Sequence, residues 1–285
     1  MRTPTLSTGV RLHVDARGPA DAPGVLLLNG LTMSVASWDP LAERLEAEFR
    51  VIRYDMRGQG RSDGPPGPHG PDQHAADLLA LVAALGHDTS LGHDRARALR
   101  LVGLSNGGLV AMLAAARLEA ERPGTVDSLV VIDSFGRVDA HLRLVLASWR
   151  AALDAGGSEL RFDVAAPWVW GHAFVARSGA SLAAARALAS SAPVDRVRSL
   201  VDGLAGYEGD AWTPLAALER PVLAICGADD VLTPVRCSAE IVRHARDARL
   251  VVLPDAGHGA PVERPDAVAG ALRDFWAGTP HGGGA

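Results

Sequence analysis

The sequence predicts an α/β protein in which helices cover both faces of a mostly parallel sheet, and two observations support this prediction. Short apolar runs recur along the chain, as in strands that are buried on both faces. Stretches with helical periodicity separate these runs, and strands that alternate with helices favour a parallel sheet. One long stretch, residues 134–219, breaks the alternation because it shows helical periodicity without a convincing strand. We therefore expect one large domain that carries a helical insertion.

The predicted elements begin with two short strands in residues 5–16, around the turn Ser7-Thr8-Gly9. A helix is expected at 40–49, because Asp39 suits the N-cap position and proline is favoured in the first turn. Residues 58–71 are rich in glycine and proline, which predicts a loop. The remaining predicted strands are 25–28, 51–54, 99–104, 129–132, 222–225 and 250–253, and the remaining helices of the main domain are 72–85, 106–118, 235–245 and 265–276.

These elements divide the chain into a core, residues 1–133 and 220–278, and an insertion, residues 134–219. The polar segment 87–97 is expected to be mobile, and the glycine-rich tail 279–285 to be disordered.

The insertion contains most of the aromatic residues of the chain, as a lid over an apolar pocket would. We expect some of Trp168, Trp170, His172 and Phe174 to face that pocket. The alternative is that these side chains simply pack the insertion onto the main domain.

Composition excludes several classes of protein. The chain has 285 residues, 48% of them hydrophobic, and a net charge of −5. It therefore lacks the basic excess that nucleic acid or an anionic membrane surface requires. The N-terminus has no continuous apolar run typical of a signal peptide, and no run of about 18 apolar residues predicts a membrane span. We expect a cytoplasmic protein whose partner is a small-molecule substrate, and the choice between monomer and homodimer stays open.

Two cysteines, Cys226 and Cys237, are too few for a disulfide framework or a zinc site. Neither a metal nor another cofactor is expected.

The most informative motif is a serine between two glycines. Ser105 follows the apolar run 99–104, precedes an alanine-rich helical stretch, and is bracketed by Gly103 and Gly107. This is the pattern of a sharp strand-to-helix turn that presents a nucleophilic serine at the start of a helix. Glycine is needed there because the turn brings backbone segments close together. Alone, the pattern also fits an ordinary tight turn.

A serine needs a base to accept its proton, and the base needs an acceptor that orients it. Among ten histidines, His258 has the best context, because it lies between two glycines just after the predicted final strand. Catalytic groups of open α/β sheets gather at that carboxyl edge.

Three aspartates are candidates for the acid. Asp229 and Asp230 follow the predicted strand 222–225, and Asp133 ends the strand before the insertion. The order serine, acid, histidine is the one that accompanies this type of turn. The residues alone do not separate Asp229 from Asp230, and one of the two is expected to cap the following helix.

With these motifs, the chain from Val10 to Trp276 resembles the α/β-hydrolase superfamily. Members commonly show G-x-x-D-x-x-x-P around the catalytic acid, and residues 227–234 match with Asp230 in the acid position. The resemblance implies a catalytic triad of Ser105, Asp230 and His258, and an eight-stranded type of sheet with a helical cap. The resemblance also covers the turn "DMRGQGRS", which is similar to the D-x-R-G-x-G-x-S turn of this superfamily. It implies that the matching residues shape a loop near the active site and have no chemical role, namely Asp55, Arg57, Gly58, Gly60 and Ser62.

The segment "LLLNGL" is similar to the strand that ends in His-Gly in this superfamily, with Asn29 in place of the histidine. The resemblance implies an oxyanion hole formed by the backbone N–H groups of Leu31 and Asn106. Such donors matter, because losing one typically costs about 10²- to 10³-fold in rate. Asn29 is also expected to line the substrate pocket.

The resemblance implies a serine hydrolase that cleaves a carboxylic ester or lactone of a small, largely apolar substrate through an acyl-enzyme. A serine at this turn argues against haloalkane dehalogenases and epoxide hydrolases. Residues 29–63 are most similar to 3-oxoadipate enol-lactonases and related esterases. Two alternatives stay open: non-hydrolytic catalysis, as by a cyclase, a lyase or a thioesterase-type acyl transferase, and ligand binding without turnover.

Overall fold

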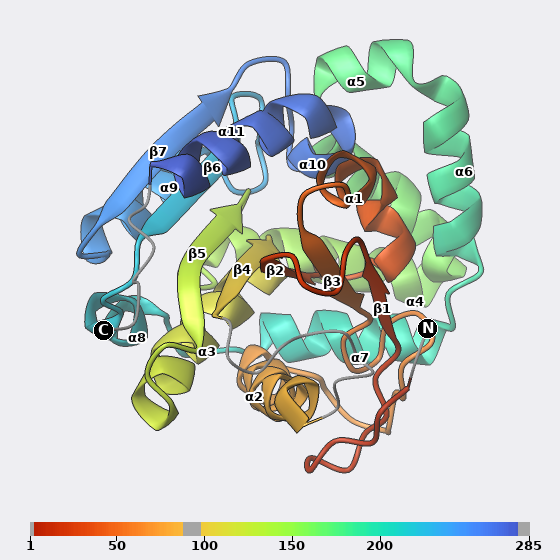
Figure 1. Cartoon of the computed structure of the whole chain (residues 1–285). Helices are drawn as coiled ribbons and strands as arrows, with labels where there is room; N and C mark the ends of the chain where they lie inside the picture. The colour runs from red at the N-terminus through yellow and green to blue at the C-terminus, as the bar shows by residue number, and fades with distance from the viewer. Residues whose placement is uncertain (1–2, 88–97, 279–285) are drawn as a thin grey trace.

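The computed structural model describes residues 3–87 and 98–278, and its centre is a seven-stranded sheet (Figure 1). The strands are β1 (Val14–Arg17), β2 (Gly24–Leu28), β3 (Arg50–Tyr54), β4 (Leu99–Leu104), β5 (Val126–Ile132), β6 (Val222–Gly227) and β7 (Ala248–Leu253). Their order is β1-β3-β2-β4-β5-β6-β7, and every pair is parallel except β1 with β3. The predicted fold class, a mostly parallel sheet flanked by helices, is confirmed.

The strand order creates a switch point beside β2. The chain passes from β2 to β3 on one side and then returns across β2 to form β4 on its other side. In open sheets of this kind, ligands bind outside the carboxyl ends of the strands at such a switch. The residues that follow β2 and β4 therefore meet at one place, although β3 separates them in the sequence.

Helices cover both faces of this sheet. One face carries α1 (Asp39–Leu45) and α11 (Pro265–Ala277), which is the blue helix in front of the sheet in Figure 1. The other face carries α2 (Pro71–His87), α3 (Asn106–Glu121) and α9 (Val235–His244). The buried side chains of β2 alternate between the two faces. Val25 and Leu27 pack with α1 and α11, and Leu26 and Leu28 pack on the opposite face with α2 and α3. The short helices η1 (Val35–Trp38) and α10 (Ala260–Glu263) complete the core.

The segment between β5 and β6 is helical throughout its regular elements. It comprises α4 (Ala140–Val169), α5 (His172–Arg177), α6 (Gly179–Ser190), α7 (Val194–Ala205) and α8 (Trp212–Ala217). Gly156 and Gly157 break α4 with non-helical backbone angles, and α4 packs on α6 and α7 while α8 packs on α3. Arg143 of α4 donates to the carbonyls of Ala205 and Tyr207, which holds the two ends of the insertion together. We refer to residues 134–219 as the cap.

The N-terminal segment differs from the prediction of two short strands in 5–16. Only a single bridge joins Thr5 and Arg11, and the first regular strand is β1. Leu6 N–H donates to the carbonyl of Val10 at 2.8 Å and Leu12 N–H to that of Pro4 at 3.1 Å, so the pairing of this segment amounts to a few backbone hydrogen bonds and not to regular strands. This is why seven strands, not eight, form the sheet in the described part of the chain. The segments 88–97 and 279–285, which include most of the predicted mobile connection and the predicted disordered tail, lie outside the described residues.

A pH-dependent stability follows from His74, which is buried on α2 with no hydrogen-bond partner at either ring nitrogen. Burial lowers the pKa of His74 to about 4. In the unfolded chain His74 is protonated below about pH 6.5, whereas in the folded chain it stays neutral down to about pH 4. The free energy of unfolding therefore decreases as the pH falls from 6.5 towards 4.

We expect His74→Phe to remove this loss. Between pH 7 and pH 5 the wild type should lose about 2 kcal/mol more unfolding free energy than His74→Phe, measured by urea denaturation. His141→Phe is the matched control, because His141 is exposed on the cap and should leave the wild-type pH dependence unchanged. Equal pH dependence in wild type and His74→Phe would contradict the prediction.

Candidate active site

Ser105 occupies a strained turn between β4 and α3. Its φ is 54° and its ψ is −119°, a conformation that L residues rarely adopt. The turn depends on its glycines: a Cβ on Gly103 would lie 2.3 Å from the carbonyl oxygen of Gly107, and one on Gly107 would lie 2.3 Å from that of Leu28. Four hydrogen bonds hold the strained residue. Ser105 N–H donates to the carbonyl of Ile132, and the Ser105 carbonyl accepts from the N–H groups of Gly108 and Leu109 and from Ser134 Oγ.

His258 and Asp230 form a buried pair at the same edge of the sheet. His258 Nδ1 lies 2.9 Å from Asp230 Oδ2. Oδ1 of Asp230 accepts the N–H groups of Leu232 and Thr233, both at 2.9 Å, and the Thr233 hydroxyl lies 2.8 Å from Oδ2. Asp229, the alternative that the residues left open, is exposed. The structure therefore brings Asp230, and not its neighbour, to the imidazole.

Opposite charges decide the ionisation of this pair. Burial disfavours the Asp230 carboxylate, but the charge of His258 and hydrogen bonds from His258 and Thr233 outweigh burial and keep the pKa of Asp230 below its ordinary value. Burial alone would lower the pKa of His258. The carboxylates of Asp230, Asp133 and Glu263 outweigh it and hold the pKa of His258 above its ordinary value of 6.5.

Asp133, the third candidate acid, has a different part in the site. It is fully buried, has a φ of 47°, and its two carboxyl oxygens accept the N–H groups of Gly227 at 2.8 Å and Ala260 at 3.0 Å. The carbonyl of Asp133 accepts from Thr233 Oγ1 at 2.9 Å. Asp133 thus connects the loop of Asp230 to the loop of His258.

The loop after β2 places the backbone N–H of Leu31. Gln59 Nε2 donates to the carbonyls of Gly30 at 2.7 Å and Leu31 at 2.9 Å. Because the N–H and the C=O of a trans peptide point in opposite directions, the bond to Gly30 turns the Leu31 N–H away from Gln59. Asn106 is the first residue of α3, and a backbone N–H in the first helical turn has no acceptor within the helix.

Asn29, an expected pocket residue, lies in a buried hydrogen-bond network of the loop after β2. Its side chain is fully buried, donates from Nδ2 to Gln59 Oε1 at 2.9 Å, and accepts at Oδ1 from Trp38 Nε1 at 2.8 Å. Both polar atoms have a partner inside the loop, so the side chain supports Gln59.

The turn after β3 is organised around Asp55, in line with the resemblance. Its carboxylate accepts the N–H groups of Val35 at 2.7 Å and Arg61 at 2.9 Å, and Ser62 Oγ donates to its carbonyl. Gly60 is required next to it, because a Cβ there would lie 2.2 Å from Asp55 Oδ2 and its φ is 43°. Arg57 forms a buried ion pair with Asp77 of α2. Gly58, with a φ of 82°, completes this turn.

The predicted pocket residues of the cap have three different environments. The rings of Trp170 and Phe174 stack at 5.1 Å, and Trp170 lies against Gly259, where a Cβ would come within 2.8 Å of its ring. Trp168 packs on the core of the insertion and meets His141 edge to face. His172 is exposed. Trp170 is thus the one that the structure brings next to the histidine loop.

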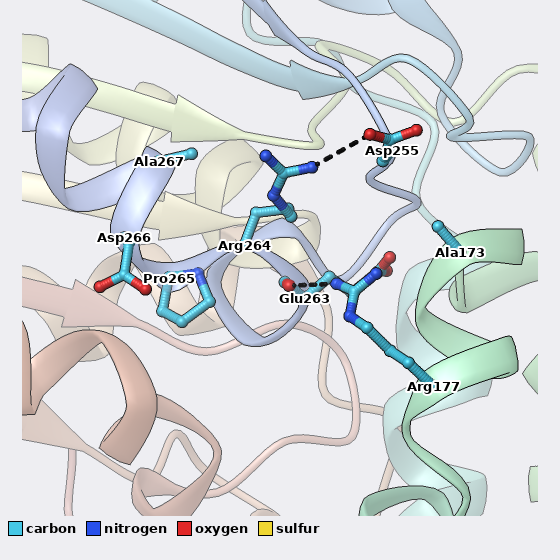
Figure 2. A pocket seen from close by; sticks show the side chains of 8 residues that line it. All are labelled: Ala173, Arg177, Asp255, Glu263, Arg264, Pro265, Asp266 and Ala267. Carbon is cyan, nitrogen blue, oxygen red and sulfur yellow. Dashed lines mark hydrogen bonds and ion pairs between the residues drawn. The ribbon is translucent and has the colours of Figure 1, made fainter.

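Two cavities in the described part of the protein are lined by neither Ser105 nor His258. One, of about 560 Å³, lies between α5 and the start of α11 and includes Arg177, Glu263 and Arg264 in its lining (Figure 2). The other, of about 220 Å³, lies between residues 135–139 and α9.

A metal has little to bind at this site. Asp133, Cys226 and Asp230 place one ligand atom each within 4.8 Å of one another. The oxygens of both carboxylates, however, already accept hydrogen bonds from backbone N–H groups and Thr233. Burial also raises the pKa of the Cys226 thiol, which disfavours the thiolate that a metal would need.

Three residues that the sequence did not single out support this geometry. Gln59 holds the loop after β2, Thr233 holds Asp230, and Glu263 contacts the loop of His258. Gln59 lies between the two glycines of the turn after β3, and Glu263 stands two residues before a proline in "HGAPVERP". A polar residue within such a motif is the signal that could have identified them. Within the described ranges, no helix is long and apolar enough to span a bilayer.

A family profile described as the alpha/beta hydrolase family matches residues 25–271. The chain belongs to this family. The resemblance inferred from the motifs is confirmed, and the protein is a hydrolase of the alpha/beta family.

Among curated relatives of this α/β hydrolase, a protein of Variovorax paradoxus named putative carbamate hydrolase RutD is 31% identical over 271 residues, which covers 93% of this chain and 96% of that protein. Among solved structures, the enol-lactonase from Burkholderia xenovorans LB400 superimposes with a TM-score of 0.84 at 25% identity, covering 97% of this chain and all of that one. A thermophilic esterase from Thermogutta terrifontis has a TM-score of 0.83 at 26% identity, covering 98% of both chains.

The two hydrogen bonds of Gln59 lead to a prediction about rate. Gln59→Leu removes the donor that orients the Leu31 peptide, so we expect kcat for ester hydrolysis to fall by about 10- to 100-fold while KM changes little. Steady-state kinetics on an aryl ester measure this. Gln73→Leu makes the same change at an exposed position of α2 and should keep wild-type kcat. A Gln59→Leu enzyme that is folded and has wild-type kcat would refute the role of Gln59.

Proposed function

We propose that this protein is a serine hydrolase that cleaves carboxylic esters or lactones of small, largely apolar molecules through an acyl-enzyme. Ser105 is the nucleophile, His258 the base and Asp230 the acid. The observation that supports this best is the buried His258–Asp230 pair at 2.9 Å, on the same sheet edge as a serine held in a strained turn at a helix start.

The mechanism follows from the positions of the donors. His258 uses Nδ1 for Asp230, which leaves Nε2 as the nitrogen that takes the proton of Ser105 as Oγ attacks the carbonyl carbon. The N–H groups of Leu31 and Asn106 stabilise the oxyanion. His258 then protonates the leaving alcohol oxygen, and water repeats the sequence to release the acid. In a lactone the leaving oxygen stays attached to the product.

The relatives support this substrate class and add a second candidate. An enol-lactonase and an esterase are among the structures most similar to the chain. A carbamate is the second candidate, because relatives that match most of the chain carry the name putative carbamate hydrolase. Serine attack on a carbamate gives a carbamoyl-enzyme by the same steps. The nitrogen lone pair makes that carbonyl less electrophilic, so oxyanion stabilisation matters more.

Two further parts of the proposal concern the ligand. The partner is a small molecule, and Trp170, packed beside Gly259, is the cap residue that we propose to contact it. Non-hydrolytic catalysis by the same serine, such as cyclisation, elimination or acyl transfer, stays the alternative to hydrolysis.

The first test is chemical labelling. We expect a fluorophosphonate to add once to the wild type, as seen by intact mass, and not to Ser105→Ala. Turnover of aryl esters should disappear in both Ser105→Ala and His258→Ala. No adduct on the wild type, or an equal adduct on Ser105→Ala, would refute the activated serine. An enzyme that is labelled but hydrolyses no ester, lactone or carbamate in a panel would favour the non-hydrolytic alternative.

The second test compares two neighbouring aspartates. Asp230→Asn should lower kcat by about 10³- to 10⁴-fold, because the imidazole loses both its orientation and its counter-charge. Asp229→Asn is the matched control and should stay within about threefold of the wild type, since an exposed carboxylate contributes little. Equal losses in the two variants would move the acid role away from Asp230.

The pH profile gives a further expectation for the same pair. A raised pKa of His258 means that kcat/KM of the wild type falls as the pH drops through a value above 6.5, because the protonated imidazole is no base. Asp230→Asn should move this acid limb to lower pH. A limb that stays in place would show that Asp230 does not set the ionisation of His258.

A further inference from the structure

Glu263 is a buried carboxylate that the proposed reaction does not use. It is the last residue of α10, five positions after His258, and its exposed fraction is 4%. Three backbone N–H groups donate to it: Gly257 at 2.9 Å, Gly259 at 3.1 Å and Gly171 at 3.2 Å. The first two flank His258, and the third belongs to the cap, at the corner between α4 and α5.

The three donors share a property that makes room for the carboxylate. All are glycines, and a Cβ would lie 2.6 Å from Glu263 Oε2 on Gly171, 3.0 Å from Oε1 on Gly257 and 3.3 Å from Oε1 on Gly259. A Cβ on Gly171 would also come within 2.5 Å of the backbone nitrogen of Gly257. The cap and the histidine loop can therefore approach closely enough to share one carboxylate.

Other contacts join the same two segments. His258 N–H donates to the carbonyl of Val169 at 2.9 Å, at the end of α4. Arg177 of α5 donates to the carbonyl of Glu263 at 2.8 Å, a bond that Figure 2 shows beside the larger cavity. The backbone on both sides of the imidazole is thus attached to residues 169–177 of the cap.

The hydrogen bonds of Glu263 are those of a carboxylate, because the partners of both its oxygens are backbone N–H donors. Burial nevertheless raises the pKa of Glu263 above its ordinary value, and the three glycine N–H groups and His258 offset only part of this effect. His258 faces the carboxylates of Asp230, Asp133 and Glu263, and each of them favours the imidazolium. Around Glu263, the guanidinium of Arg177 lies against its carbonyl, and Arg264 pairs with Asp255.

We propose that Glu263 is a positioning residue for His258, which fixes both backbone N–H groups beside the imidazole and ties the histidine loop to the cap at Gly171. The proposal rests on the proposed function in one respect, namely that His258 is the base. Glu263 touches neither the substrate nor the reacting atoms in this scheme. It acts through the placement and the proton affinity of the imidazole.

The test uses Glu263→Gln, which keeps the shape but replaces an acceptor oxygen by an NH₂ group that cannot accept from a glycine N–H. We expect the plateau rate of fluorophosphonate labelling at Ser105 to fall by about 10- to 100-fold, since misplacement of a catalytic group by about 1 Å can cost 10²-fold. The acid limb of the pH profile of this labelling rate should move to lower pH. For hydrolysis of an aryl ester, KM should change less than kcat.

Asp266→Asn is the matched control. It removes one carboxylate from the lining of the same cavity, but this carboxylate is exposed and pairs with Arg44. Its labelling rate and acid limb should equal those of the wild type. A Glu263→Gln enzyme with wild-type rate and wild-type limb would overturn the proposal.

A second readout separates this inference from the proposed function. The pKa of the His258 imidazole, followed by NMR of the histidine ring in the full-length protein, should be lower in Glu263→Gln than in the wild type. If the wild type shows no labelling but the His258 pKa moves in Glu263→Gln, the serine mechanism fails and the positioning role stands. If the His258 pKa and ring shifts are unchanged, the positioning role fails.

A third variant covers a Glu263→Gln protein that does not fold. Glu263→Asp keeps the charge and withdraws the carboxylate by one methylene from the glycine N–H groups. We expect a lower plateau rate with an unmoved acid limb, whereas a wild-type rate in Glu263→Asp would overturn the proposal.

Discussion

The buried carboxyl group of Asp133 connects the parts of the site. One oxygen accepts from Gly227, at the end of β6, and the other from Ala260, two residues after His258. Its backbone carbonyl accepts from Thr233, which in turn holds Asp230. The loops that carry Asp230 and His258 are therefore both anchored to the end of β5. Such an anchor has a cost, because burial, and then the nearby Asp230, raise the pKa of Asp133 well above its usual range.

Three buried carboxyl groups around one imidazole give the site its electrostatic character. Asp230 bonds to the ring itself, and Asp133 and Glu263 bond to the backbone that follows or flanks it. Carboxylates in such a dry place persist only where N–H donors satisfy their oxygens. The same donors define the shape of the histidine loop, so the position of the His258 imidazole and its affinity for a proton come from one set of contacts.

The cap takes part in this arrangement through its backbone as well as its aromatic side chains. Val169 and Gly171 bond to His258 and Glu263, and Trp170 between them covers Gly259. Aromatic composition predicted a lid over a pocket. Of the residues expected to line that pocket, Asn29 supports the loop after β2 and His172 is exposed. The sequence does not distinguish a side chain that supports the site from one that lines the pocket, because both positions use the same residue types. Only the packing in the folded chain distinguishes them.

The fold class followed from the amino-acid sequence, which also singled out Ser105 and His258 as the proposed nucleophile and base. These follow from local rules: a turn this sharp requires glycines at 103 and 107, and buried strands require apolar runs. The residues alone left Asp229 and Asp230 open, and the family motif pointed to Asp230. Only the folded chain shows which of the two adjacent carboxylates reaches the imidazole. It also assigned Gln59, Asp133 and Glu263, whose partners lie in distant segments of the chain. Such hydrogen bonds form because the strand order of the sheet brings loops from distant segments together. No local sequence pattern encodes which loops become neighbours.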